Sequence, residues 1–158
     1  MPVGIWLFVA LASKRLEVEE VDTNSALGRI LASDHTSRLQ LPPFDKSAMD
    51  GYAVRADDRR DKYRVVATVA AGEARDQAIQ AGTAVKIMTG AAVPPGGGRV
   101  IKVEDTEQDG DDIRIIRHGS NTNIALQGED VRPGDIVLPS GTHLGALELA
   151  NLVACGIT

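Results

Sequence analysis

The chain has 158 residues, of which 43% are hydrophobic and 3% aromatic, with a formal net charge of −5 and a pI near 5.1. This length suits one domain or two small lobes, and the hydrophobic content excludes a disordered chain. The acidic charge and scarcity of aromatic residues argue against binding to phosphate backbones or stacked bases, so nucleic acid is not an expected partner.

The first element along the chain is an apolar run at residues 5–12. No Lys or Arg precedes it, so the positive region of a secretory signal is missing, and the run is too short to span a membrane. We interpret it as a buried helix, with a weak or uncleaved signal as the alternative. A cytoplasmic protein without a membrane partner is therefore expected.

A second helix is predicted over residues 23–31, where Thr23 or Asn24 can act as N-cap and the apolar residues form one stripe. Gly28 weakens this prediction because glycine destabilises a helix interior. Residues 33–39 favour an extended conformation.

Residues 41–54 form the most informative stretch. Two prolines exclude a helix, and the Asp50-Gly51 pair predicts a tight turn because glycine tolerates positive φ. The stiff loop carries Asp45, Ser47 and Asp50 into a strand, an arrangement typical of binding loops. The alternative is a purely structural turn.

From there the pattern changes to short strands separated by glycine-rich turns, typical of a β-rich region. The last turn leads into a helix with Gly156 at its C-terminal cap. The predicted strands are 63–70, 84–88, 99–103, 113–115 and 136–138, and the predicted final helix covers 144–153.

Together these elements predict an α+β, mostly β fold. A β-rich lobe over residues 37–134 is inserted into a small helical lobe made from both termini, residues 1–36 and 135–158. Cys155, the single cysteine, lies in an apolar segment and is interpreted as a buried structural thiol. His35, His118 and His143 lie far apart in sequence, so no metal site is predicted.

Four polar clusters lie beside the predicted strands and could converge on one edge of the sheet. Convergent carboxylates can bind a cation, orient amines and hydroxyls, or act as acid and base. A solvated acidic rim explains Glu104 to Glu107 and Asp109 to Asp112 at least as well. The clusters are Asp45/Ser47/Asp50, Thr89/Gly90, Glu104/Asp105/Thr106 and Glu129/Asp130.

A series of motifs in this order resembles the N-terminal half of the molybdopterin molybdotransferases, the family of MoeA and the gephyrin E domain. Residues 41–54 are close to the family signature LPPFDxSAMDGYAV, and residues 26–32 are similar to its ALGRVLA segment. Further matches are AGE at 71–73, IMTGAxVP at 87–94, VVxVEDT at 100–106 and GEDV at 128–131.

The resemblance implies an enzyme that inserts molybdenum from molybdate into adenylylated molybdopterin in molybdenum cofactor biosynthesis. It implies a homodimer whose active cleft is shared between subunits. Carried over motif by motif, Asp50 and Thr89 are the implied catalytic residues. Asp130 is an implied substrate-binding residue, with Ser47 and Glu104 as further candidates by proximity. Mg²⁺ is expected with ligands mostly outside this chain.

Two departures from the family pattern affect the expected activity. No counterpart of the family's larger α/β domain follows Thr158, and the first eight residues lack the usual polar, Glu-rich character. The chain is therefore expected to supply one wall of the site and to be inactive alone. The alternative is a catalytically inactive, shortened relative that acts as a dimerisation or scaffold module.

Overall fold

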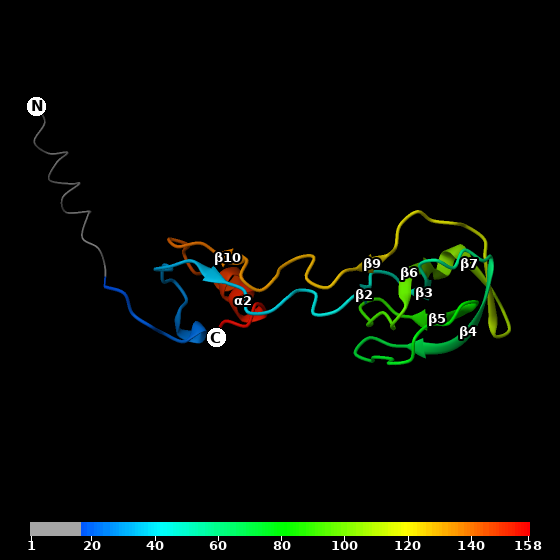
Figure 1. Ribbon diagram of the computed structural model, residues 1–158. Coiled ribbons are helices and arrows are strands. Elements are labelled where there is room, and N and C mark those ends of the chain that lie inside the picture. The colour runs from blue at the N-terminus through cyan, green and yellow to red at the C-terminus, as the bar shows by residue number, and fades with distance from the viewer. Residues whose placement is uncertain (1–16) are drawn as a thin grey trace, which may run out of the picture. The chain divides into compact units, whose positions relative to one another are not determined.

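The computed structural model describes residues 17–158, so the helix predicted at residues 5–12 lies outside the described residues (Figure 1). The described chain divides into two compact units. One contains residues 17–36 and 136–158, and the other contains residues 37–135. Most regular structure is β, and the mostly β, α+β class predicted from the sequence is confirmed.

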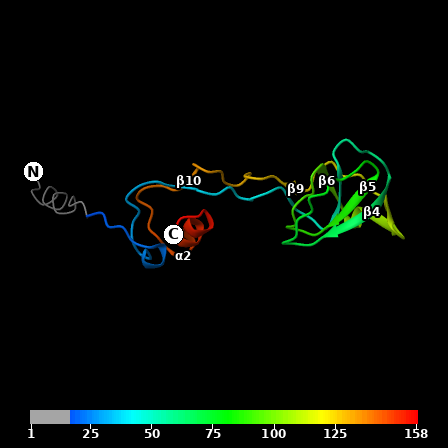
Figure 2. The same cartoon turned by 60° about the horizontal axis from the view of Figure 1, so that its bottom comes forward.

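The larger unit is built on a six-stranded sheet with the order β6-β3-β5-β4-β8-β7. Only β4 and β5 pair in parallel, and the other neighbours are antiparallel. Figures 1 and 2 show the curled shape of this sheet. Its strands are β3 (Gly51–Arg55), β4 (Lys62–Val69), β5 (Thr83–Ile87), β6 (Gly97–Lys102), β7 (Thr106–Asp109) and β8 (Asp112–Ile115).

A short strand pair and one 3₁₀ turn complete the regular structure of this unit. The short strands β2 (Lys46–Ser47) and β9 (Ile124–Ala125) pair with each other, and the 3₁₀ turn η2 (Val103–Asp105) follows β6. The predicted strands 63–70, 84–88 and 99–103 are confirmed within two residues at each end, because their apolar residues alternate or run continuously as buried strands require.

Strands β3, β5 and β6 carry buried side chains on both faces of the sheet, which explains their high content of aliphatic residues. Successive side chains of a strand point to opposite faces. Tyr52 and Val54 therefore join one apolar cluster with Tyr63, whereas Ala53 joins a second cluster with Val85. Strand β3, which lies between β6 and β5, thus carries buried residues on both faces and fixes the segment that leads into it.

Gly51, at the start of β3, is required for a reason that differs from the sequence prediction. It does not adopt a positive φ, so the tight turn predicted at Asp50-Gly51 is wrong. A Cβ atom on Gly51 would lie 2.1 Å from the carbonyl oxygen of Ile101 in the neighbouring strand. Glycine is therefore needed because β6 passes close to the backbone at this point.

The smaller unit contains η1 (Thr23–Ser25), β1 (His35–Thr36), β10 (Ile136–Leu138) and the helix α2 (Ala146–Ala154). Strands β1 and β10 pair antiparallel. Its core is formed by Ala26, Leu31, Leu138, Leu144 and Leu152.

The helix predicted over residues 23–31 is wrong, since only the single 3₁₀ turn η1 forms there. Gly28 adopts φ +79°, which ends any helical run, and Ile30 pairs with His143 instead. The apolar residues of this segment still contribute Ala26 and Leu31 to the core. Tertiary pairing has therefore replaced the local helical preference.

The helix α2 confirms the sequence prediction and ends in a Schellman motif. Gly156 has φ +79° and donates its N–H to the carbonyl of Val153, and the N–H of Ile157 bonds to that of Leu152. Cys155 is buried and free, as predicted. Among residues 17–158 there is no helix with the length and apolar character needed to cross a membrane.

Candidate functional site

The candidate site is built around Asp50, which directly precedes β3, and Thr89, which follows β5. In the antiparallel β3–β5 pair Gly51 lies opposite Ile87, so the residues just outside this ladder come side by side. The Oδ1 atom of Asp50 accepts hydrogen bonds from the backbone N–H and the Oγ1 hydroxyl of Thr89, both at 2.7 Å. The register of one strand pair therefore joins residues 39 positions apart in sequence.

These two donors stabilise the ionised form of the Asp50 carboxyl. The backbone N–H of Thr89, followed by its hydroxyl, lowers the pKa of Asp50 below its usual range, and desolvation opposes them only partly. A carboxylate with a lowered pKa is a weak base, so this group is suited to positioning and charge stabilisation rather than to proton abstraction.

The Asp50 carboxylate is also accessible. Asp50 and Thr89 are both exposed, and no residue among 17–158 donates a hydrogen bond to the Oδ2 atom of Asp50. An ionised carboxylate is a pure acceptor, so Oδ2 can receive N–H or O–H donors from a ligand. The pair thus presents a fixed anion to solvent.

Ser47, a predicted substrate contact, lies on the inner side of the same loop. It is only 1% exposed. Its hydroxyl donates to the carbonyl of Met49 at 2.5 Å, and its backbone binds Gly90 and Ala91 on the loop after β5. The geometry therefore gives Ser47 the task of holding the Asp50 loop against the Thr89 loop.

Glu104, the second candidate by proximity, lies in η2 and is exposed. The N–H of Val103 donates to the backbone carbonyl of Asp50 at 3.1 Å, which brings η2 against the start of β3. The next residue, Asp105, is turned inward and pairs with Arg117 at 3.2 Å. Glu104 is thus attached to the Asp50 segment through the backbone.

Asp130 is placed beside a different part of the loop. Its backbone N–H donates to the carbonyl of Leu41 at 3.0 Å, and its side chain is exposed. Within residues 17–158, no hydrogen bond or ion pair joins the Asp130 side chain to Asp50 or Thr89. The structure therefore links Asp50 directly with Thr89, and it does not show Asp130 as part of that pair.

Asp45 and Glu129, from the same polar clusters, have structural partners. The Oδ1 atom of Asp45 accepts the N–H of Gln127 at 2.7 Å, and Glu129 accepts the N–H of Leu126 at 2.8 Å. Both carboxylates satisfy backbone donors of the loop after β9. Their part in the site is to fix that loop beside residues 43–45.

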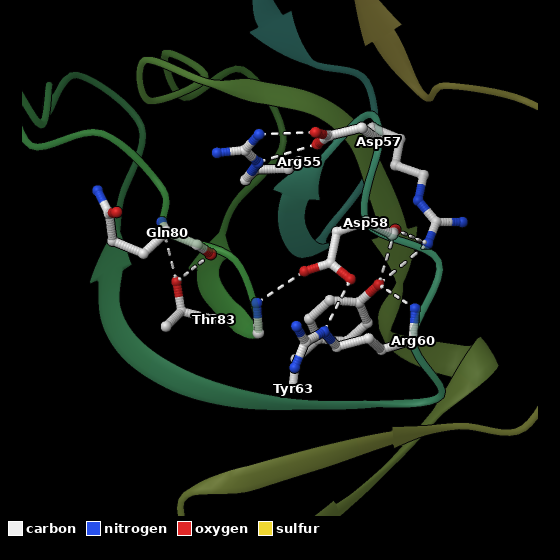
Figure 3. A network of polar contacts seen from close by, with 9 residues as sticks. Arg55, Asp57, Asp58, Arg60, Tyr63, Gln80 and Thr83 are labelled. Carbon is white, nitrogen blue, oxygen red and sulfur yellow. Dashed lines mark hydrogen bonds and ion pairs between the residues drawn. The ribbon is translucent and has the colours of Figure 1, made fainter.

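A second polar network, missed from the sequence, surrounds Asp58 and Tyr63 (Figure 3). The buried Asp58 carboxylate accepts the N–H of Gly82 at 2.7 Å and the Nε–H of Arg60 at 3.2 Å. The Gly82 N–H is the main cause of the lowered pKa of Asp58, with Arg60 adding to it and burial opposing it. All residues from 57 to 62 are charged, a pattern typical of a solvent-exposed segment. The sequence therefore does not indicate that Asp58, unlike its neighbours, is buried.

The described residues do not form a metal centre. Among residues 17–158 no group of three His, Cys, Asp or Glu side chains is gathered as metal ligands would be. One oxygen of Asp50 is already occupied by Thr89. Within this part of the chain there is therefore no preassembled cluster of three such ligands for Mg²⁺.

Comparisons with known proteins agree with the motifs. The family model for the MoeA N-terminal region, domains I and II, matches residues 7–156. The chain is 32% identical over 158 residues to a molybdopterin molybdenumtransferase of Staphylococcus epidermidis, covering 94% of this chain and 38% of the relative. It is 35% identical over 158 residues to that of Nostoc sp. (strain PCC 7120), covering 95% of this chain and 36% of the relative. The chain thus spans under two-fifths of these relatives.

Solved structures show the same fold. A crystal structure of the molybdopterin biosynthesis MoeA protein from Pyrococcus horikoshii OT3 is 39% identical with a TM-score of 0.80, covering 88% of this chain and 39% of that chain. A second structure of the Pyrococcus horikoshii MoeA protein is 34% identical with a TM-score of 0.84, covering 100% of this chain and 43% of that chain.

Proposed function

The chain belongs to the family of the MoeA N-terminal region, and on this premise we propose that it is part of a molybdopterin molybdotransferase. In this proposal it supplies one wall of a cleft in which molybdenum from molybdate enters adenylylated molybdopterin. The observation that carries the proposal is the exposed Asp50 carboxylate at the start of β3, whose ionised form is stabilised by two hydrogen bonds from Thr89.

Asp50 contributes binding and orientation. Its accessible Oδ2 can accept hydrogen bonds from amino, ring N–H or hydroxyl groups, which a pterin carries. Because the strand register and Thr89 fix the carboxylate before a ligand arrives, little reorganisation is needed on binding. Thr89 acts through Asp50 and is a positioning residue, since its hydroxyl donates to Oδ1.

The other candidate residues are proposed either to position the Asp50 loop or to add exposed carboxylates. Ser47 positions the Asp50 loop from the inside, and Glu104 adds an exposed carboxylate on the adjoining turn. Asp130 is proposed as a substrate contact reached by a different part of the ligand, because it is not bonded to Asp50. In this proposal the ligands of Mg²⁺ lie mostly outside this chain, and the roles of Asp50, Thr89 and Ser47 do not depend on the ion.

The rest of the cleft is proposed to come from residues outside this chain and from a second protomer of a cytoplasmic homodimer. A chimera tests this proposal. The chain replaces the region that it matches in the Nostoc enzyme, and the chimera is expressed in a strain that lacks the transferase.

Recovery of molybdoenzyme activity is expected from the chimera and not from the chain alone. A chimera that folds and dimerises but restores no activity would overturn the enzymatic proposal. That result would favour a dimerisation or scaffold role instead.

A further inference from the structure

The buried arginine of β6, Arg99, has no carboxylate partner among residues 17–158. Only 8% of its surface is exposed. Its Nη2 atom donates to the backbone carbonyl of Asp58 at 3.0 Å and to the hydroxyl of Tyr63 at 3.3 Å. The buried Nε–H has no hydrogen-bond partner in the described chain.

The nearby acid does not neutralise this charge. The carboxylate of Asp58 is occupied by Gly82 and Arg60, and only its backbone carbonyl faces Arg99. A desolvated guanidinium without an anionic partner is unfavourable. The network therefore leaves one buried positive charge without a counter-ion.

Arg99 also lines two adjoining hollows beside β6, which share Gly119 and Asn121. The larger hollow has a volume of about 150 Å³ and contains no Asp or Glu in its lining. Since a water molecule takes roughly 30 Å³ in the liquid, this space can hold a small ion. Its polar lining residues are Arg59, Arg99, Ser120, Asn121 and Thr122.

The charge around the smaller hollow has the same sign. Arg99, Lys102 and Arg117 line it, and its one acid, Asp105, is paired with Arg117 at 3.2 Å. The surroundings are thus cationic in a chain whose net charge is −5. A concave surface lined by one sign of charge concentrates the opposite ion.

We propose that the larger hollow binds a doubly charged tetrahedral oxyanion, either free or as the phosphate group of a small organic phosphate. Arg59 supplies charge-assisted donors, Arg99 adds the positive charge of a buried guanidinium beside the hollow, and Ser120, Asn121 and Thr122 supply neutral donors. None of these residues belongs to the Asp50–Thr89 pair. The proposed anion site therefore uses different residues from the proposed transferase site.

An NMR titration of the chain with inorganic phosphate tests the proposal. Sodium chloride keeps the ionic strength constant, because unspecific attraction is screened by salt. Saturable shifts are expected for the amides of residues 119–122 and for the Nε–H of Arg99. A parallel titration with glycerol 3-phosphate identifies the source, since tighter binding than phosphate indicates an organic ligand and weaker binding indicates a free oxyanion.

A matched pair of variants separates a built site from general attraction. Arg59 and Arg64 are both exposed, and no side-chain hydrogen bond to either is present in residues 17–158, but only Arg59 lines the hollow. R59Q should weaken phosphate binding about tenfold, as expected for a lost charge-assisted hydrogen bond, whereas R64Q should not. An absence of saturable shifts at millimolar phosphate, or equal weakening by both variants, would overturn the proposal.

Discussion

The Oδ1 atom of Asp50 lies 2.7 Å from both the backbone nitrogen and the hydroxyl oxygen of Thr89, just beyond the end of the β3–β5 strand ladder. This relationship gives the loop a fixed anion that is exposed at one oxygen.

Substituting Thr89 by valine removes the hydroxyl donor and keeps the backbone donor. Because both donors lower the pKa of Asp50, T89V should raise that pKa part of the way to its usual range. An NMR pH titration of the Asp50 carboxyl carbon measures the change. T68V is the matched control, since Thr68 is exposed on β4 and the hydrogen bonds to Asp50 come from Thr89. An unchanged Asp50 pKa in T89V would show that the Thr89 hydroxyl does not contribute to lowering it.

Substituting Gly51 by alanine should destabilise the larger unit by about 2 kcal/mol, because the new Cβ overpacks against the backbone of β6. The contact would be 2.1 Å from the carbonyl oxygen of Ile101. Urea unfolding measures the loss. G119A is the control, since a Cβ at Gly119 meets nothing within 4 Å. Equal stability of the two variants would show that β3 and β6 separate at little cost.

Substituting Ser47 by alanine should destabilise the larger unit by about 1 kcal/mol, through the loss of a buried hydrogen bond. The hydroxyl is 1% exposed and serves only the backbone of Met49 among the described residues. A variant as stable as S120A, in which the substituted serine is exposed, would argue against a positioning role.

The stability of the larger unit should fall in acid because of Asp58. The pKa of Asp58 is lowered in the folded state, so its stabilisation is present above the unfolded-state pKa, near 3.8, and is lost as the pH falls through the folded value. D58N should lose about 2 kcal/mol at neutral pH and flatten this dependence. Urea unfolding at neutral and acid pH measures both effects.

D111N is the control for Asp58, because Asp111 is exposed and no side-chain partner for it is present among residues 17–158. It should keep the acid dependence of the unsubstituted chain. If D58N and D111N behave alike at every pH, the hydrogen bonds from Gly82 and Arg60 do not contribute as described.

Local sequence patterns predicted the elements whose cause is local. The alternating apolar residues of β4 and the glycine after α2 each follow from a few neighbouring residues. Residues 23–31 also carry a local helical pattern, yet pairing of Ile30 with His143 prevails there. Local preference is weak wherever a distant strand competes for the same backbone.

The geometry of the candidate site depends on strand pairing, which no local sequence pattern specifies. Nothing near Asp50 in the sequence indicates that Thr89 is its partner, since this follows from the β3–β5 register. The resemblance named both residues without giving their contact. Likewise, Gly51 is explained by the close approach of β6, and the Arg99 environment by a loop that lies beyond that strand in sequence.

The central claim is that the Asp50 carboxylate takes part in the transfer reaction, and its most direct test is molybdoenzyme activity restored by the chimera carrying D50N. Asparagine keeps the size of the side chain and an acceptor for Thr89 but removes the negative charge. The control is D111N, which removes an exposed carboxylate elsewhere on the same sheet. The account predicts at least about a tenfold loss of activity for D50N, as for a charge-assisted contact, and none for D111N. Full activity of a folded D50N chimera would contradict it.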